Sequence, residues 1–384
     1  MNLLGVKLTL LIGRTVPVPV PLPMMENLDT VEVTQSDTGQ SGFQITFKAG
    51  RSGPIDILDY QLLGNPLLMP HNRAVIIVTL NAIPRVLMDG IILDRQLNPS
   101  TKPGASTITL SGKDVSIMMD KEQKPVERLA QNEFVAALMI IAQYAQYGLI
   151  PMVMPPFMID FPLPMERTPV QRATDLQHLQ NLAGRFGYVF YIKPGPAPLM
   201  NTAYWGPPVR VGIPKKALSV NLGGDTNVER LDFRHDAKQA STFYGKVHDR
   251  NLNQHLPFET FASLRIPPLA LFPAVPFDLL NVRRTLLDNV EGLNYAQAFA
   301  KAQAETDKSM DSVLTATGEL DTARYGDLLE ARGLVGLRGA GFSYDGFYYV
   351  QSVSHSISTN GAYKQRFTLT REGVGSTTPV VPVL

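Results

Sequence analysis

A capped helix that runs straight into a strand is the feature that most constrains this chain. Thr174 can cap the helix, and Gln177 three residues later completes a capping-box pattern. Apolar residues then recur at helical spacing and predict one buried stripe. The stripe consists of Leu176, Leu179, Leu182, Ala183 and Phe186. Gly187 stands where a left-handed residue ends a helix, and 188–192 is aromatic and β-branched, as in a strand. The stretch therefore predicts a core-forming unit with no chemistry of its own.

Residues 1–112 alternate strand-like segments with turn-forming residues. The predicted strands are 5–12, 30–35, 42–48, 74–80, 86–96 and 106–111. Short strands at this spacing indicate a small barrel or sandwich. The stretch 15–23 alternates proline with other residues, so it cannot pair as a central strand. It is either a stiff connector or an arm that contacts a partner.

The middle of the chain changes to helical patterning. Asn132 can cap a helix that continues to Tyr147, with Gly148 ending it. Its predicted buried face consists of Phe134, Leu138, Ile141 and Ala145. The stretch 151–164 is rich in proline and methionine, so it is either a packed loop or a promiscuous binding surface. Residues 193–216 have the composition of a loop.

Strand-like segments return after residue 216. They are 217–222, 228–234, 240–247, 313–320, 334–338, 346–357 and 363–370. A helix begins after Asn294, with Gln297 at the third position, and ends near Met310. The apolar tail 373–384 has no periodic pattern, so it is either frayed or docked on another surface.

These patterns predict an α+β, β-dominated fold. We expect a first β domain (1–112), an inserted α/β domain (113–216), a second β domain with one helix (217–372) and a C-terminal tail (373–384). At 384 residues the chain is long enough for such a division.

Composition excludes several classes of function. The net charge is +1 and the basic residues are scattered, so nucleic-acid binding is not predicted. Cysteine is absent, which excludes disulfides and thiolate metal sites. No run approaches the ~20 apolar residues of a membrane span, and Lys7 interrupts the apolar start, which reads as a strand rather than a signal peptide. The charged fraction is 18%, below the roughly 25% of ordinary domains, so either a large subunit interface or a large core is expected.

The six histidines form no recognised catalytic or metal pattern. His248 and His255 are seven residues apart without an acidic companion at ligand spacing, which disfavours a zinc site. His178 is expected to be a solvated side chain on the polar side of its helix.

Acidic residues also fail to form a catalytic arrangement. On a strand, Asp232 and Asp236 would share one face while His235 pointed to the other, which is poor geometry for a triad. Glu330 and Arg332 could pair with a neighbouring subunit. We therefore predict no catalytic, cofactor-binding or metal-ligating residue.

The opening stretch also carries a resemblance. The pattern R-x-T-D-x-x-x-L-x-x-L-A-x-x-x-G-Y-x-F-Y at 172–191 resembles a motif of phage tail hub proteins, the family of the late-control D proteins and the hub half of VgrG. The chain looks nearer still to the baseplate hub of extracellular contractile injection systems. Supporting blocks lie, in matching order, at 111–120, 144–151, 201–208, 324–326, 336–341, 345–350 and 363–373.

The resemblance implies a structural adaptor without enzymatic activity or cofactor. Such hubs are ring-forming homotrimers, and each subunit carries two small tube-like β-barrels beside an inserted α/β domain. Three subunits thus present six barrels, which seat a hexameric inner tube at one end and hold a trimeric spike at the other. The remaining implied partners are baseplate wedge components. The particle would assemble in the bacterial cytoplasm and could then be released from the cell.

The tail is the one segment to which the resemblance assigns a contact. The chain stops at residue 384 without a spike-like extension, so the spike is expected to be a separate protein. By analogy, the tail docks on that spike. The expected docking residues are Val380, Val381, Val383 and Leu384.

Two alternative functions come from other classes. A particle-associated cell-wall hydrolase would need two facing carboxylates, which the sequence does not indicate. A module that binds a surface ligand would use the methionine-rich stretch and the single tryptophan. Its binding residues would be Met152, Met154, Met158 and Trp205.

Overall fold

The protein is described from a computed structural model. The described residues are 2–3, 5–37, 39–50, 60, 62–102, 104–128, 131–156, 170–249, 253–274 and 282–379.

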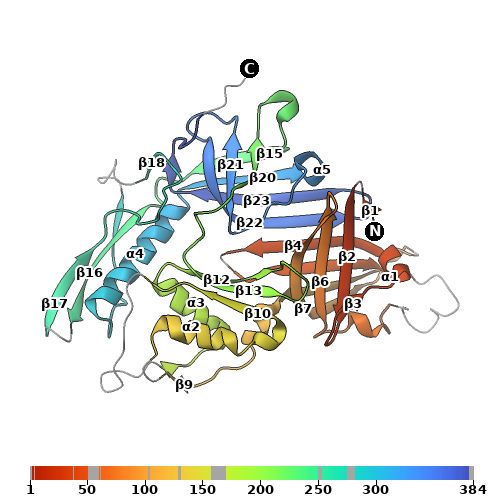
Figure 1. Ribbon diagram of the computed structural model, residues 1–384, viewed down its shortest axis with the longest axis horizontal. Helices are drawn as coiled ribbons and strands as arrows, with labels where there is room; N and C mark the ends of the chain where they lie inside the picture. The colour runs from red at the N-terminus through yellow and green to blue at the C-terminus, as the bar shows by residue number, and fades with distance from the viewer. Residues whose placement is uncertain are drawn as a thin grey trace.

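One large sheet runs through both ends of the chain (Figure 1). In the described residues it contains fourteen strands, with the main path β1-β2-β6-β7-β8-β5-β4-β22-β23-β20-β15. From the first half come β1 (Asn2–Leu3), β2 (Val6–Gly13), β3 (Val18–Pro19), β4 (Leu28–Ser36), β5 (Gly42–Lys48), β6 (Arg73–Leu80), β7 (Ile83–Asn98) and β8 (Thr107–Asp114). From the second half come β14 (Lys215–Ser219), β15 (Arg230–His235), β20 (Leu314–Asp321), β21 (Leu334–Arg338), β22 (Gly346–Ser358) and β23 (Tyr363–Arg371).

The strands of the first half surround one apolar core. Every second side chain of β2 from Val6 to Ile12 is buried, as a strand with one core face requires. The short helix α1 (Leu22–Glu26) adds Met24 and Met25 to that core. The proline-alternating stretch pairs only through β3 with β2, beside the end of the sheet. This agrees with the prediction that it cannot be a central strand.

The second half has its own core, and its two edge strands are tied together. Strand β14 ends at Ser219, whose carbonyl accepts from the backbone amides of Asn227 at 3.0 Å and Val228 at 3.4 Å. The next amide, of Glu229, donates to Glu319 on β20. The chain thus passes from one edge of this half to the other between Ser219 and Glu229.

The antiparallel pairing of β4 with β22 joins the two halves. It pairs Thr30 with Ser358 and Ser36 with Ser352, so the ladder covers most of β4. The fold is β-dominated, as predicted. However, the ladders of the described residues form one open, continuous sheet, and none of them closes either half into a separate barrel.

The inserted region forms a three-stranded sheet with two helices. Its strands are β10 (Leu149–Val153), β12 (Val189–Pro194) and β13 (Asn201–Gly206); its helices are α2 (Glu133–Ala142) and α3 (Asp175–Arg185). Strand β13 is central, parallel to β10 and antiparallel to β12. It lies within 193–216, which we predicted as a loop. The prolines and glycines around it conceal a strand of only six residues.

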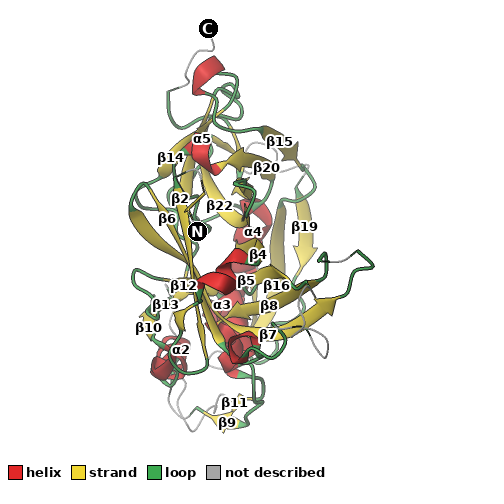
Figure 2. Cartoon of the chain, turned by 90° about the vertical axis from the view of Figure 1, so that its right-hand side faces the viewer, coloured by secondary structure: helices red, strands yellow, loops and turns green. Residues whose placement is uncertain are grey.

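Short elements complete this region. They are η3 (Val115–Met119), η4 (Ala145–Tyr147) and the paired strands β9 (Val126–Glu127) and β11 (Val170–Gln171). In Figures 1 and 2, β9 lies at the end of the molecule opposite the C-terminus.

The predicted N-cap of α3 at Thr174 and its predicted left-handed end at Gly187 are confirmed. The amide of Gln177 donates to Oγ1 of Thr174. At the other end, Gly187 has φ +62°, and the amides of Gly187 and Tyr188 donate to the carbonyls of Gly184 and Ala183. These two bonds form a Schellman motif.

The predicted face of α2 was right at Ile141 but wrong at Leu138. The helix is capped by Asn132, as predicted, but it buries Ala136, Ala137, Ile140 and Ile141. Leu138, expected inside, is exposed. The helix is apolar on most sides, so periodicity alone could not select the packed face.

A second small sheet lies beside the large one. Its strands are β16 (Ser241–Asp249), β17 (Gln254–Glu259) and β19 (Arg283–Leu286), and α4 (Tyr295–Asp311) lies across it (Figure 1). The predicted Asn294–Gln297 capping box of α4 is present. The remaining elements are η2 (Pro66–Leu68), η5 (Gly223–Asp225), α5 (Thr322–Tyr325) and the paired strands β18 (Phe272–Pro273) and β24 (Gly373–Val374).

Candidate functional site

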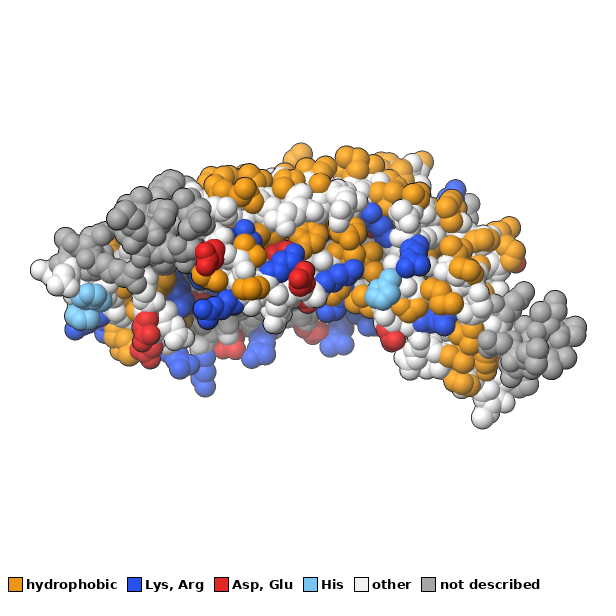
Figure 3. Space-filling view, turned by 90° about the horizontal axis from the view of Figure 1, so that it is seen from below, with side chains coloured by type: hydrophobic (Ala, Val, Ile, Leu, Met, Phe, Trp, Pro, Cys, Tyr) orange, Lys and Arg blue, Asp and Glu red, His pale blue; other side chains and the backbone are white. Residues whose placement is uncertain are grey.

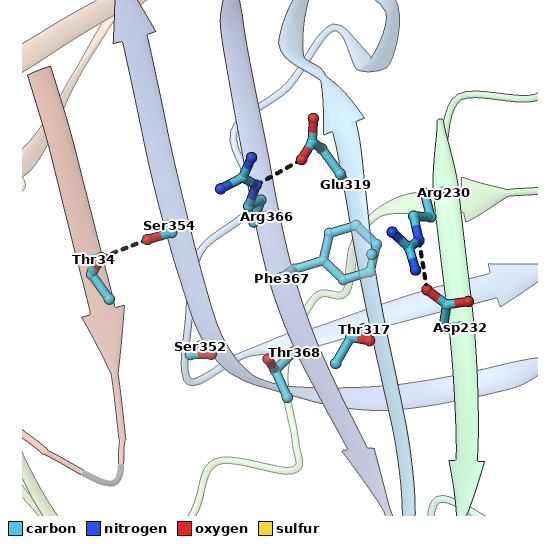
Figure 4. A pocket seen from close by; sticks show the side chains of 11 residues that line it. Thr34, Arg230, Asp232, Thr317, Glu319, Ser352, Ser354, Arg366, Phe367 and Thr368 are labelled. Atoms are coloured by element: carbon cyan, nitrogen blue, oxygen red, sulfur yellow. Dashed lines mark hydrogen bonds and ion pairs between the residues drawn. The ribbon is translucent and has the colours of Figure 1, made fainter. Parts of the chain in front are cut away.

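A broad polar face crosses the junction of the two halves. It lies on five neighbouring strands, β4, β22, β23, β20 and β15, and forms a shallow hollow of about 440 Å³ (Figure 4). Alternate residues of these strands, such as Val353 and Leu369, are buried on the other side. Hydroxyl side chains line much of the hollow, and Thr34 bonds Ser354 across the β4–β22 seam at 2.5 Å.

The charges on this face are paired with one another. Glu319 accepts from Nε of Arg366 at 2.6 Å and from Lys364 at 2.9 Å, and these bonds hold the pKa of Glu319 below its ordinary value. Arg230 pairs with Asp232 at 2.8 Å. Both carboxylates are therefore engaged by cations and are not a facing acid–base pair. The face is polar and charge-balanced, which suits contact with water or with polar partners.

Arg332 joins three parts of the chain. Its Nη2 donates to the Ser36 carbonyl at 2.5 Å and to Oγ of Ser41 at 2.8 Å, and its Nη1 donates to the Ile192 carbonyl at 3.2 Å. Its guanidinium lies 4.0 Å from the ring centre of Tyr191. The sequence suggested that Arg332 could pair with another subunit, but it is buried and bound within its own chain.

Glu330 is also bound within the chain. It contacts Lys215 at 2.7 Å, Lys193 at 3.3 Å and Arg85 at 3.4 Å. Burial would raise the pKa of Glu330, but the lysines outweigh it and hold that pKa below its ordinary value. The suggested pairing with a neighbouring subunit is therefore replaced by three contacts inside the chain.

A second buried ion pair fixes the inserted region to the first half. Arg73 donates to both oxygens of Asp89, at 2.6 and 2.7 Å, and to the Tyr147 carbonyl at 2.9 Å. Asn201 donates to the same carboxylate at 2.9 Å. Because this pair is almost fully buried, removal of one partner would leave an uncompensated charge.

The root of the C-terminal tail is docked on its own chain. Strand β24 pairs with β18, and the amide of Ser376 donates to the Phe342 carbonyl at 2.9 Å. The buried carboxylate of Glu372 accepts from Arg210 at 3.1 Å. Val380, Val381, Val383 and Leu384, the expected spike-docking residues, lie outside the described residues.

Among the described residues, the histidines and acids considered in the sequence form separate contacts rather than one cluster. His248 faces His255 across the β16–β17 ladder, with ring centres 5.0 Å apart. Asp236 pairs with Arg234 rather than with His235. In the described part of the chain, no three histidine or acidic side chains gather as metal ligands would.

The residues proposed for a surface ligand are divided between surface and core. Met152 and Met154 are exposed. Trp205 is fully buried, and its indole donates to the Leu179 carbonyl at 3.1 Å, which contradicts the alternative in which it contacts a surface ligand. Met158 lies outside the described residues.

The structure reveals two perturbed histidines. His178 is half-buried rather than solvated, and burial lowers its pKa to about 4. His355 is fully buried beside the Tyr363 hydroxyl at 3.0 Å, and burial lowers its pKa to about 4 as well. His355 lies at an inward position of β22, where alternation with the serines around it could have indicated burial.

Viewed from below, hydrophobic side chains gather along one edge of the molecule, while acidic and basic side chains are intermixed across the middle (Figure 3). This face has no large patch of one charge among the residues that the structure describes. None of the helices in the described ranges has the length and apolar character that crossing a bilayer requires.

The chain shares its fold with tail proteins of known structure. The tail protein of Neisseria meningitidis MC58 aligns with a TM-score of 0.65 at 14% identity, over 97% of this chain and 98% of that one. The 43 kDa tail protein of prophage MuSo2 from Shewanella oneidensis aligns with a TM-score of 0.63 at 14% identity, over 96% and 98%.

The same fold occurs in a secretion system. The E. coli c3393 protein, a type VI secretion component described as similar to the T4 tail proteins gp27 and gp5, aligns with a TM-score of 0.55 at 10% identity, over 93% of this chain and 77% of that one. No family model matches the sequence, and no curated protein matches it. At these identities the likeness shows the fold alone.

Proposed function

We propose that this protein is a structural, non-enzymatic baseplate hub that connects a hexameric inner tube to a trimeric spike in a contractile particle. The observation that carries the proposal is the likeness to tail proteins over nearly the whole length of both chains. The motif at 172–191 also supports the proposal. Two of its polar residues, Thr174 and Asp175, stabilise the N-terminus of α3. Thr174 caps that helix, and Asp175 accepts from the Tyr144 hydroxyl at 2.7 Å.

The hub would be a homotrimer. In this proposal the two β halves of each subunit act as tube-like units without closing as separate barrels, so three subunits present six similar units to the tube. Cyclic assembly uses one repeated heterologous contact. It would also cover apolar side chains at the sheet end, such as Val16, Val18 and Leu22, which are exposed in the single chain.

The tail end is the proposed contact with the spike. Leu271, Phe272 and Phe342 are substantially exposed beside the docked root of the tail. Wedge components would bind elsewhere on the subunit. Assembly would take place in the bacterial cytoplasm, with release of the completed particle.

Truncation after Pro379 tests the spike contact without removing β24. We expect the shortened chain to fold normally but to lose at least tenfold in affinity for the particle's own spike protein, measured by co-sedimentation. A matched variant with serine at the four apolar tail positions should behave in the same way. Unchanged spike retention by both would refute the tail contact, while failure of the full-length chain to bind the spike would refute the hub role.

A further inference from the structure

A groove separate from the polar sheet face lies where the three parts of the chain meet. It has a volume of about 610 Å³, within the range of about 300–1,000 Å³ of sites that enclose a ligand. Its lining comes from β4, β7, β10, β12 and β13, and from the segment that begins at Leu328. The sequence had offered Met152 as one of several residues for a surface ligand, and Glu330 and Arg332 for contact with a neighbouring subunit, but it did not bring them together.

The floor of the groove is rigid. Gln35 donates to the Leu87 carbonyl at 2.7 Å, joining β4 to β7. Tyr191 and Tyr204 stack with ring centres 5.0 Å apart, and Arg332 covers the Tyr191 ring. All five side chains are buried. A ligand would therefore meet a preformed surface.

One wall is apolar and adaptable. Met152 is 51% exposed at the groove, and its neighbours Ile150 and Met154 on the same strand face are 49% and 46% exposed. Methionine side chains adjust to ligands of irregular shape because they are unbranched and polarisable. The three side chains project at every second position along β10 and the residue that follows it, which suits an extended partner segment.

At another part of the lining, three cations lie near two carboxylates. Lys193, Lys215 and Arg85 all share Glu330, and among these contacts only Arg85 has a second acidic partner, Asp327 at 3.2 Å. Lys193 is the most exposed of them, and an ammonium has three donors. A third carboxylate, from a ligand, would balance the three cations of this cluster.

We infer that the groove binds an extended acidic segment of a partner protein, with apolar residues against the methionine wall and a carboxylate at Lys193. The inference goes beyond the hub role and does not depend on it. Backbone and apolar contacts would provide affinity, and the carboxylate would fix the direction of the segment.

Two fluorescein-labelled decapeptides test the inference by fluorescence anisotropy, one alternating leucine with glutamate and the other alternating leucine with lysine. The intact protein should bind the acidic peptide at least tenfold more tightly. Lys193→Glu should reverse this preference, and Met152→Ser should weaken binding of the acidic peptide. Lys246→Glu, a matched change of an exposed strand lysine outside the groove, should alter nothing.

Equal binding of both peptides, or an equal effect of Lys193→Glu and Lys246→Glu, would overturn the inference. So would the absence of binding at about 1 mM peptide, where the free energy of binding is only about −4 kcal/mol. Sedimentation of the same variants tests whether the groove instead binds another copy of this chain. A loss of self-association in Lys193→Glu alone would assign the groove to another copy of this chain and overturn the peptide assignment.

Discussion

The guanidinium of Arg332 lies 4.0 Å from the ring centre of Tyr191, and this contact couples the second β half to the inserted region. The same side chain donates to Ser36 and Ser41 in the first half. Arg332 has φ +68°, an unusual conformation for a non-glycine residue, which is held by the surrounding contacts. One arginine thus holds together segments that are 296 positions apart in the sequence.

Replacing this arginine should be costly. Arg332→Met would leave two carbonyls and a hydroxyl without a donor, at about 1–3 kcal/mol for each buried group. We expect the free energy of unfolding to fall by about 2–4 kcal/mol in urea titrations, allowing for relaxation. Arg230→Met, at a side chain that is 78% exposed, is the matched control and should change stability by less than about 0.5 kcal/mol. Equal losses of stability in Arg332→Met and Arg230→Met would show that the buried contacts of Arg332 do not stabilise the fold.

His355 should make the protein sensitive to acid. Its folded-state pKa, about 4, is below the ordinary value of 6.5, so the unfolded chain binds the proton more readily. The contribution of neutral His355 to the free energy of unfolding is fully present above pH 6.5. It is lost as the pH falls toward 4, and the total loss is about 3 kcal/mol. His355→Gln should therefore flatten the dependence of stability on pH in this window, although His178 will retain a part of it. An unchanged slope would show that His355 is not buried in its neutral form.

Asp37 should act in the opposite direction. Burial is the largest influence and raises its pKa from 3.8 to about 6, even though Tyr349 and Arg332 favour the charged form. The folded chain then binds the proton more tightly, so this residue reduces stability as the pH rises from about 4 through 6. We expect Asp37→Asn to be more stable than the parent by about 1–3 kcal/mol at about pH 8 and similar to it at about pH 4. If Asp37→Asn is less stable than the parent at about pH 8, the charged carboxylate of Asp37 stabilises the fold.

Two glycines near the end of α3 offer a matched comparison. Gly187 has φ +62°, and a Cβ there would approach Ala304 of α4 at 3.1 Å. A Cβ at Gly184 would meet nothing within 4 Å. Gly184→Ala should thus stabilise by about 0.5–1 kcal/mol, and Gly187→Ala should destabilise by about 1–2 kcal/mol. Thermal melts of both variants check this, and the same sign for both would contradict the described end of α3.

The sequence predicted local structure well because local signals determine it. The caps at Thr174 and Asn294, and the strand at Gly42–Lys48, depend on residues close in the chain. The face of α2 was only partly predicted because most of its side chains are apolar. Strand β13 was missed because turn-forming residues surround it.

The candidate sites could not be predicted from local patterns. The polar face combines residues of β4 and β15 with three strands near the C-terminus. The groove requires Met152, Lys193 and Arg332 to come together from separate segments. Nothing in the spacing of these residues encodes that contact. The burial of Trp205 likewise depends on α3 and β13 packing together.

The mass of the particle formed by the purified full-length chain tests the central claim most directly. Sedimentation equilibrium and native mass measurement at micromolar concentration should both give three times the chain mass of 42.2 kDa. A trimer is expected because the proposed hub presents six tube-like units from three chains. A stable monomer under the same conditions would contradict the account.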